Sequence, residues 1–184
     1  MKNMLCRALC VTLLALCVML PAALAQDVIT VYAADYDVTE NGWYDTLEEV
    51  AIYLTEYDRL PENFITQNEA KALGWQSNRG NLWDVAYGYS IGGDRFGNYE
   101  GLLPDAKGRR WTECDIGFEG GYRGSERIVF SNDGLLYYTD DHYETFDEIL
   151  VSWETADGYD AYGDYGGGDL MRELDDIVYW LFGE

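Results

Sequence analysis

Positive charge and histidine are scarce in this sequence. Lysine and arginine together number 12 against 34 aspartate and glutamate residues, His142 is the one histidine, and the formal net charge is −22. Such an acidic chain repels nucleic acid at long range, so this balance taken alone argues against a protein that acts on RNA. Solubility, or adaptation to a salty or acidic medium, would also explain the acidity, and composition does not decide between them.

Long apolar segments are also rare, and the clearest one lies near the N-terminus. It runs from Ala8 to about Leu20, follows a short basic segment and precedes the small-residue pattern Ala23-Leu24-Ala25. This layout predicts a secretory signal peptide over residues 1–25 and an extracellular protein. The run is short for a membrane span and no second candidate follows it, which predicts no stable membrane association after cleavage.

Cysteine is also scarce in this sequence. The chain has 4 cysteines, and cleavage after Ala25 leaves Cys114 alone. A single cysteine excludes an intramolecular disulfide, so the mature chain must be held together by its hydrophobic core. The remaining length suits one domain with extensions. We expect a lead segment at residues 26–42, a compact domain at 43–150 and an acidic, Gly- and Tyr-rich extension at 151–184.

Helical patterns occupy the first half of the compact domain. Residues 46–49 fit a capping box, and apolar residues then recur at helical spacing as far as Tyr57. Residues 66–69 fit a second capping box, and Gly74 is a candidate C-cap for that short helix. Asn81 is a candidate cap for a third helix.

Strand patterns occupy the second half. Short apolar and aromatic runs are separated by Gly, Asn and Asp, and the Asn-Asp-Gly at residues 132–134 indicates a hairpin turn. Helices followed by antiparallel strands predict an α+β fold. The predicted strands cover residues 89–96, 110–118, 126–131, 135–139 and 143–149.

Several separate segments carry a resemblance to a known family. They read, in order between about Tyr44 and Ile149, LPENFITQNEAKALGW, GNLWDVA, SIGGDRFGN, EGLLP, GRRWTECDI, GYRGSERIVFSN and TDDHYETF. The sequence resembles the barnase-like, secreted bacterial guanyl-specific ribonucleases. The resemblance implies N-terminal helices packed on a roughly five-stranded antiparallel sheet. It also implies cleavage of single-stranded RNA after guanosine through a 2′,3′-cyclic phosphate, with no metal or other cofactor.

The resemblance assigns the candidate catalytic residues. Glu113 matches the general base, His142 the general acid, and Arg123 and Arg127 the phosphate-contacting pair. Internal attack on RNA needs a base for the 2′-OH proton, an acid for the leaving 5′-oxygen and positive charge around the phosphate. Taken singly, each of these residues also has a plainer interpretation as a solvated or structural side chain.

The resemblance places guanine recognition at residues 96–100. Backbone N–H groups of this loop can meet the base O6, and the Glu100 carboxylate can accept from N1–H and the amino group, a pair that adenine lacks. The plainer interpretation is a Gly-Asn turn. The candidate substrate-binding residues are Gly97, Asn98, Tyr99, Glu100, Gln67 and Tyr143.

Two of these residues depart from the family pattern. Gln67 stands where the family has a lysine, and Tyr99 stands where it has an arginine. Each departure removes a charge-assisted contact at a cost of about 1–3 kcal/mol. Together they predict a ribonuclease that is slower by about a hundredfold or more, rather than an inactive one.

Other functions stay open at this point. A catalytically faded interaction protein on the same fold would explain both departures, and an antibacterial ribonuclease toxin would share the chemistry. The expected partners are RNA and a barstar-like acidic inhibitor protein. The acidic extension is either a solubilising or partner-docking segment, or an inhibitor in cis that contacts Arg123 and Arg127.

Overall fold

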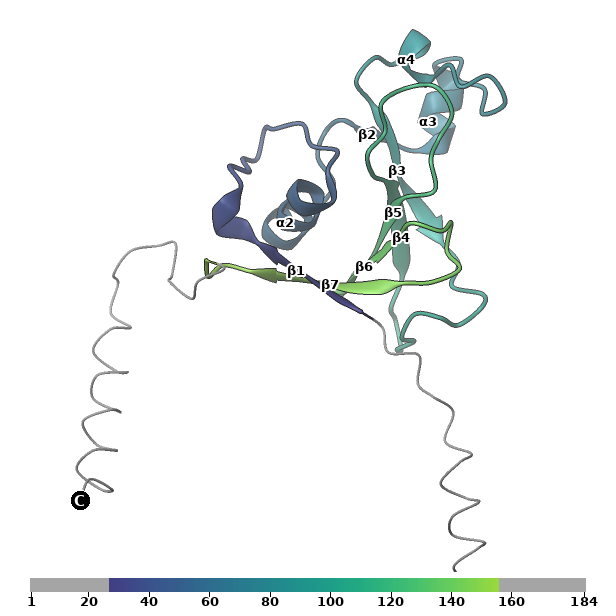
Figure 1. Ribbon diagram of the computed structural model, residues 1–184. Coiled ribbons are helices and arrows are strands. Elements are labelled where there is room, and N and C mark those ends of the chain that lie inside the picture. The colour runs from purple at the N-terminus through teal and green to yellow at the C-terminus, as the bar shows by residue number, and fades with distance from the viewer. Residues whose placement is uncertain (1–26, 156–184) are drawn as a thin grey trace, which may run out of the picture.

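The five predicted strand segments form the centre of one sheet in the computed structural model, which describes residues 27–155 (Figure 1). These strands are β3 (Ser90–Phe96), β4 (Trp111–Asp115), β5 (Arg127–Ser131), β6 (Leu136–Thr139) and β7 (Asp147–Ser152). Each pairs antiparallel with the next, so this part of the sheet follows chain order. The hairpin signal at residues 132–134 lies between β5 and β6, and the α+β class is confirmed.

The expected strand number and direction are wrong at the two edges of the sheet. The sheet has seven strands in the order β1-β7-β6-β5-β4-β3-β2. β1 (Val28–Tyr32) pairs parallel with β7, and β2 (Phe64–Ile65) pairs parallel with β3. Both pairings satisfy backbone N–H and C=O groups that would otherwise line an open edge. The pairing of β1 also buries Val31, which is 2% exposed.

Helix ends follow the capping signals at two of the three predicted sites. The Thr46 side chain accepts a hydrogen bond from the Glu49 N–H at the start of α2 (Leu47–Tyr57). Thr66 and Glu69 form a complete capping box at α3 (Gln67–Ala72). The prediction for Asn81 is wrong, because its side chain makes no cap on α4 (Leu82–Val85) and instead bonds the backbone of the turn after α3.

The central strands separate the core into two faces. Successive side chains alternate, so Cys114 in β4 and Ile128 in β5 pack with α2, β1 and the 3-10 turn η1 (Ala33–Asp35). Figure 1 shows α2 over the β1–β7 side of the sheet, with α3 and α4 together near β2 and β3. The opposite face carries a second cluster, formed by Leu103, Trp111, Val129, Tyr137 and Phe146. This second face also carries most of the predicted site residues.

The predicted signal peptide and residues 156–184 of the acidic extension lie outside the described residues, and so does the proposed contact of that extension with Arg123 and Arg127. Within residues 27–155, no helix is both long enough and apolar enough to span a membrane.

Candidate active site

Strand alternation places Glu113 on the face of β4 that points away from α2. Its neighbour Cys114 is 1% exposed in the core beneath α2, where burial raises the pKa of the thiol. Asp115, two residues after Glu113, returns to the same face as Glu113. β4 pairs with β5 so that Asp115 stands opposite Arg127. One short stretch of sheet therefore presents two carboxylates and a guanidinium together.

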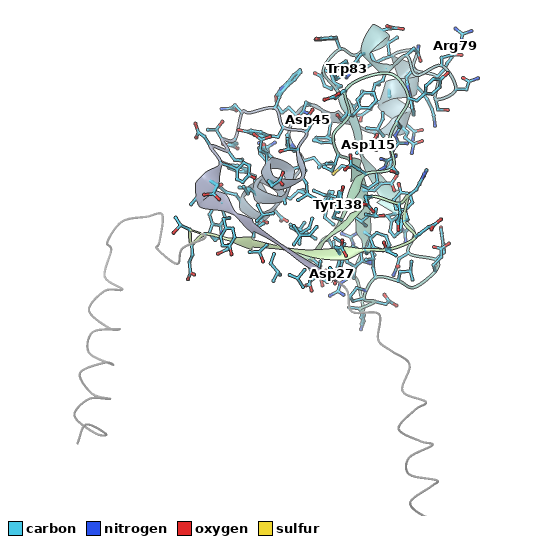
Figure 2. The ribbon with its side chains drawn as sticks, viewed as in Figure 1. Asp27, Asp45, Arg79, Trp83, Asp115 and Tyr138 are labelled. Carbon is cyan, nitrogen blue, oxygen red and sulfur yellow. The ribbon has the colours of Figure 1, made fainter. Side chains whose placement is uncertain are left out.

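Asp115 organises the two predicted arginines. Its carboxylate accepts from Arg123 Nε at 2.6 Å and from Arg123 Nη2 at 2.5 Å, a two-pronged contact. Its Oδ1 also lies 2.9 Å from Arg127 Nε, an ion pair without hydrogen-bond alignment. Asp115 is 2% exposed, and Figure 2 shows it at the sheet. Burying a charge is costly unless it is paired, so the two arginines offset the cost of burying the Asp115 carboxylate.

The two arginines differ in what they can reach. Arg127 is 2% exposed and donates to the carbonyls of Gly124 and Glu126, so it ties down the end of the β4–β5 loop. The Arg123 side chain is 21% exposed and bonds Asp115 through Nε and Nη2. Arg123 is therefore better placed to meet an anion from solvent, and Arg127 helps to hold the loop that carries it.

The segment that connects β6 to β7 places His142 and Tyr143. The predicted strand over residues 143–149 is wrong at its start, because β7 begins at Asp147 and the residues before it form a turn. His142 and Tyr143 both have positive φ, 64° and 75°. Consecutive left-handed residues other than glycine are unusual and require support from their surroundings.

Asp141 supplies that support. Its Oδ1 accepts from Thr139 Oγ1 and from the N–H groups of Glu144 and Thr145, and its Oδ2 accepts from Thr145 Oγ1. These contacts, led by those with Thr145, lower the pKa of Asp141 to about 2. Thr139 also accepts from the Tyr143 N–H at 3.0 Å. The hydrogen bonds that hold this turn therefore converge on the Asp141 carboxylate.

Tyr143 connects this turn to β4. Its hydroxyl donates to Glu113 Oε2 at 2.8 Å. Burial, followed by the nearby Glu113 carboxylate, raises the pKa of Tyr143 to about 12, so the phenol stays protonated as a donor. The His142 ring lies beside the Tyr143 ring, with centroids 5.1 Å apart, and is exposed. The exposed imidazole therefore lies next to the residue that bonds Glu113.

We predict that Asp141→Ala lowers the unfolding temperature at neutral pH, whereas Asp140→Ala, a neighbouring exposed acid, changes it little. The Asp141 pKa is lowered in the folded protein from an ordinary 3.8 to about 2. Its stabilising effect is therefore complete above about pH 4 and is lost as the pH falls through about 2. Thermal unfolding of parent and variant from pH 6 to pH 2 should show the difference shrinking. A constant difference at every pH would contradict this role.

The predicted recognition loop continues from β3. Phe96 packs its ring 5.2 Å from that of Tyr143 and 5.9 Å from that of Phe146, which joins the loop to the turn that carries His142. Asn98 has a φ of 44°, and its side chain bonds both the N–H and the carbonyl of Leu103. Gly97 lies beneath the Tyr99 ring, and Glu100 is exposed. The loop is therefore held at its base and open at Tyr99 and Glu100.

Gln67 lies at the first position of α3. Its backbone N–H donates to Asp94 Oδ2 at 2.7 Å. Asp94 is the partner of Glu113 across the β3–β4 ladder, so this bond fixes the start of α3 beside the carboxylate face. The structure brings the start of α3 to this face, as it does Glu113, Arg123, Arg127 and Tyr143.

Sequence reasoning missed the structural roles of three carboxylates, those of Asp94, Asp115 and Asp141. The sequence did contain an indication of Asp115. Residues two apart in a strand lie on the same face, so this spacing places Asp115 beside the candidate Glu113. The partners of Asp94 and Asp141 are backbone N–H groups, which the sequence does not single out.

The chain is similar in sequence to known ribonucleases. Residues 48–150 match a family model described as ribonuclease. A ribonuclease of Bacillus intermedius is 53% identical over 113 residues, which cover 61% of this chain and 70% of that protein. A ribonuclease of Heyndrickxia coagulans is 53% identical over 105 residues, covering 57% of this chain and 96% of that protein. Guanyl-specific ribonuclease St of Saccharopolyspora erythraea is 37% identical over 67 residues, covering 36% and 66%. The chain therefore belongs to the barnase-like family of microbial ribonucleases.

Proposed function

We propose that this protein is an extracellular endoribonuclease that cleaves single-stranded RNA on the 3′ side of guanosine. One contact carries the proposal: the hydrogen bond between the Tyr143 hydroxyl and Glu113, 2.8 Å long. It joins the turn that presents His142 to the strand that presents Glu113 and Asp115. Base, acid and guanidinium groups then border the same space, as internal cleavage of RNA requires.

The first step forms a cyclic phosphate. Glu113 takes the proton of the 2′-OH, and the 2′-oxygen bonds to phosphorus. The bond from phosphorus to the 5′-oxygen breaks, and His142 gives that oxygen its proton. Arg123 donates to the phosphate oxygens while negative charge builds on them. Arg127 acts mainly by holding Asp115 and the loop that carries Arg123.

The second step opens the ring. His142, now neutral, takes a proton from water, whose oxygen bonds to phosphorus. The bond to the 2′-oxygen breaks and Glu113 returns the proton to that oxygen, which leaves a 3′-phosphate. No metal takes part in either step of this mechanism.

Guanine preference is assigned to the loop after β3. Backbone N–H groups at Gly97 and Asn98 face the base O6, and Glu100 accepts from N1–H and the amino group. Support comes from the anchoring of Asn98 to Leu103 and from the name of the Saccharopolyspora relative. The signal-peptide pattern of residues 1–25 supports export, and RNA and an acidic inhibitor protein are the proposed partners.

The cleavage of GpN and ApN dinucleotides by residues 26–184 tests this function. We expect GpN to be cleaved with the higher kcat/KM. Glu100→Ala should lower kcat/KM for GpN by about 10- to 150-fold, because it removes charge-assisted hydrogen bonds, and should change ApN cleavage little. Asp105→Ala, which removes an exposed acid from the same connection, serves as the control. Equal losses on both substrates would contradict the assignment of Glu100.

A second candidate function is a faded interaction protein on the same fold. It is favoured by the site's formal charge. The site has two arginines, whereas Glu113, Asp115 and Asp94 make three carboxylates on the same face. Gln67 adds no charge to this balance. A parent protein that cleaves no dinucleotide would favour this second candidate.

A further inference from the structure

A groove of about 210 Å³ opens between the segment after β1, helix α2 and the end of β7, on the left in Figure 1. Part of its lining comes from residues 33–38 and from Trp153, which lie outside the residues that match the ribonuclease family model, 48–150. Its lining residues also pack with α2, on the side of the sheet opposite to Glu113. The groove is therefore separate from the proposed active site.

The groove has an apolar base and aromatic sides. Ala33 and Ile52 line its base and are 7% and 2% exposed. Tyr36 and Trp153 also line it, and these two large side chains remain 38% and 42% exposed. Exposed aromatic rings beside a hollow offer a surface on which a ligand can lie.

Carboxylates supply the charge of the groove. Asp37 and Glu56 line it and are exposed, and within residues 27–155 neither forms an ion pair. Burial, followed by neighbouring carboxylates led by that of Glu48, raises the pKa of Tyr36, in keeping with negative charge around the groove. This lining suits a long cationic side chain, whose stem packs on apolar surface while its head group meets rings and carboxylates.

The chain itself carries such a side chain close by. The described part of the chain ends at Thr155, two residues after Trp153, and Arg172 is the only basic residue in 156–184. A chain as long as residues 156–171 spans about 22 Å on average, which suffices to return to the groove. Tethering over so short a stretch gives a local concentration on the order of millimolar, so a contact too weak to hold a separate molecule can still form.

We propose that the C-terminal extension folds back along α2 and places Arg172 in this groove, with its guanidinium against the two rings and between the two carboxylates. A guanidinium stacks on aromatic faces and presents a fork of donors to carboxylates. The other charged residues of 156–184 are all acidic, so the contact depends on this one arginine. The extension would then lie on the side of the sheet away from Glu113, and the inference does not rest on the proposed function.

Disulfide trapping in the mature chain, residues 26–184, tests this inference. Ala34 lines the groove and is exposed, so Ala34→Cys with Met171→Cys places one thiol at the groove and one beside Arg172. We expect the intramolecular disulfide to form about 5- to 30-fold faster than when Arg172→Ala is added, the factor that an ion pair with a cation–π contact supplies. Asp105→Cys with Met171→Cys is the control, because Asp105 is exposed between β3 and β4, across the sheet from β7. Cys114 is 1% exposed and should not compete.

Exchange of the charges supplies the second measurement. In the Ala34→Cys, Met171→Cys protein, Glu56→Arg and Arg172→Glu should each slow cross-linking, and the two together should restore part of the rate. Cross-linking no faster than in the control pair, a rate that Arg172→Ala leaves unchanged, or a combined variant as slow as the slower single variant would each overturn the contact.

Discussion

Replacing Asp115 with alanine is expected to destabilise the protein by about 3–5 kcal/mol, the usual cost of removing one partner from a buried ion pair. Asp115 and Arg127 are each 2% exposed, and Asp115 also holds Arg123 by two hydrogen bonds. Without the carboxylate, the Arg127 guanidinium remains buried without a counter-charge. The loop between β4 and β5 then loses the contact that fixes Arg123, so RNA cleavage should fall as well.

Urea unfolding of parent, Asp115→Ala and Asp115→Asn measures the effect. The asparagine variant keeps the shape and removes the charge, so a similar loss in both variants identifies the charge as the cause. Glu40→Ala is the control, because Glu40 pairs with Arg59 at the surface, where their side chains are 63% and 43% exposed. Exposed pairs contribute little to stability, so its effect should be much smaller. Equal stability of Asp115→Ala and the control would overturn the central role of Asp115.

The second large effect concerns catalysis. Glu113→Gln and His142→Ala are each expected to lower kcat for GpN cleavage by about 10²- to 10⁴-fold, the usual contribution of a positioned acid or base. The double variant should be only slightly slower than the slower single variant, because the two groups serve one proton-transfer pathway. Both variants should remain folded, since His142 is exposed and Glu113 has one side-chain hydrogen bond, to Tyr143.

The pH profile of kcat/KM distinguishes the two roles. The base must be deprotonated and the acid protonated, so the parent should show a bell-shaped profile. Glu113→Gln should lose the acidic limb and His142→Ala the alkaline limb. Tyr143→Phe serves as a comparison, because it removes the hydroxyl bonded to Glu113 but neither proposed proton carrier. Variants as active as a parent that cleaves GpN would overturn the assignment of Glu113 and His142 as base and acid.

Local patterns in the sequence predicted the central part of the fold. The caps at Thr46 and Thr66, the turn before β6 and the five central strands depend on neighbours in the chain, so their signals are local. The parallel pairing of β1 with β7 joins Ile29 to Ile149, and alternation within either strand does not identify its partner. That is why the edges of the sheet differ from the expectation.

The residues of the candidate site could be predicted only through the resemblance to a known family. Glu113, His142, Arg123 and Arg127 came from the family resemblance, since their residue types alone have common structural roles. The turn before β7 was missed because its aromatic residues, Tyr143 and Phe146, fit a strand pattern equally well. What decides the conformation there is the set of hydrogen bonds to Asp141, which only the folded chain reveals.

The β1–β7 pairing has a consequence for the order in which the protein is made. β1 is the first described strand to leave the ribosome and β7 the last, so this edge cannot close until nearly the whole described chain has been synthesised. The turn that carries His142 ends where β7 begins and shares that delay. In a chain exported from its N-terminus, we expect both to assemble only after the last strand has crossed the membrane. Under that proposed route of export, the open β1–β7 edge would keep the protein from maturing beside the RNA of the cell that makes it.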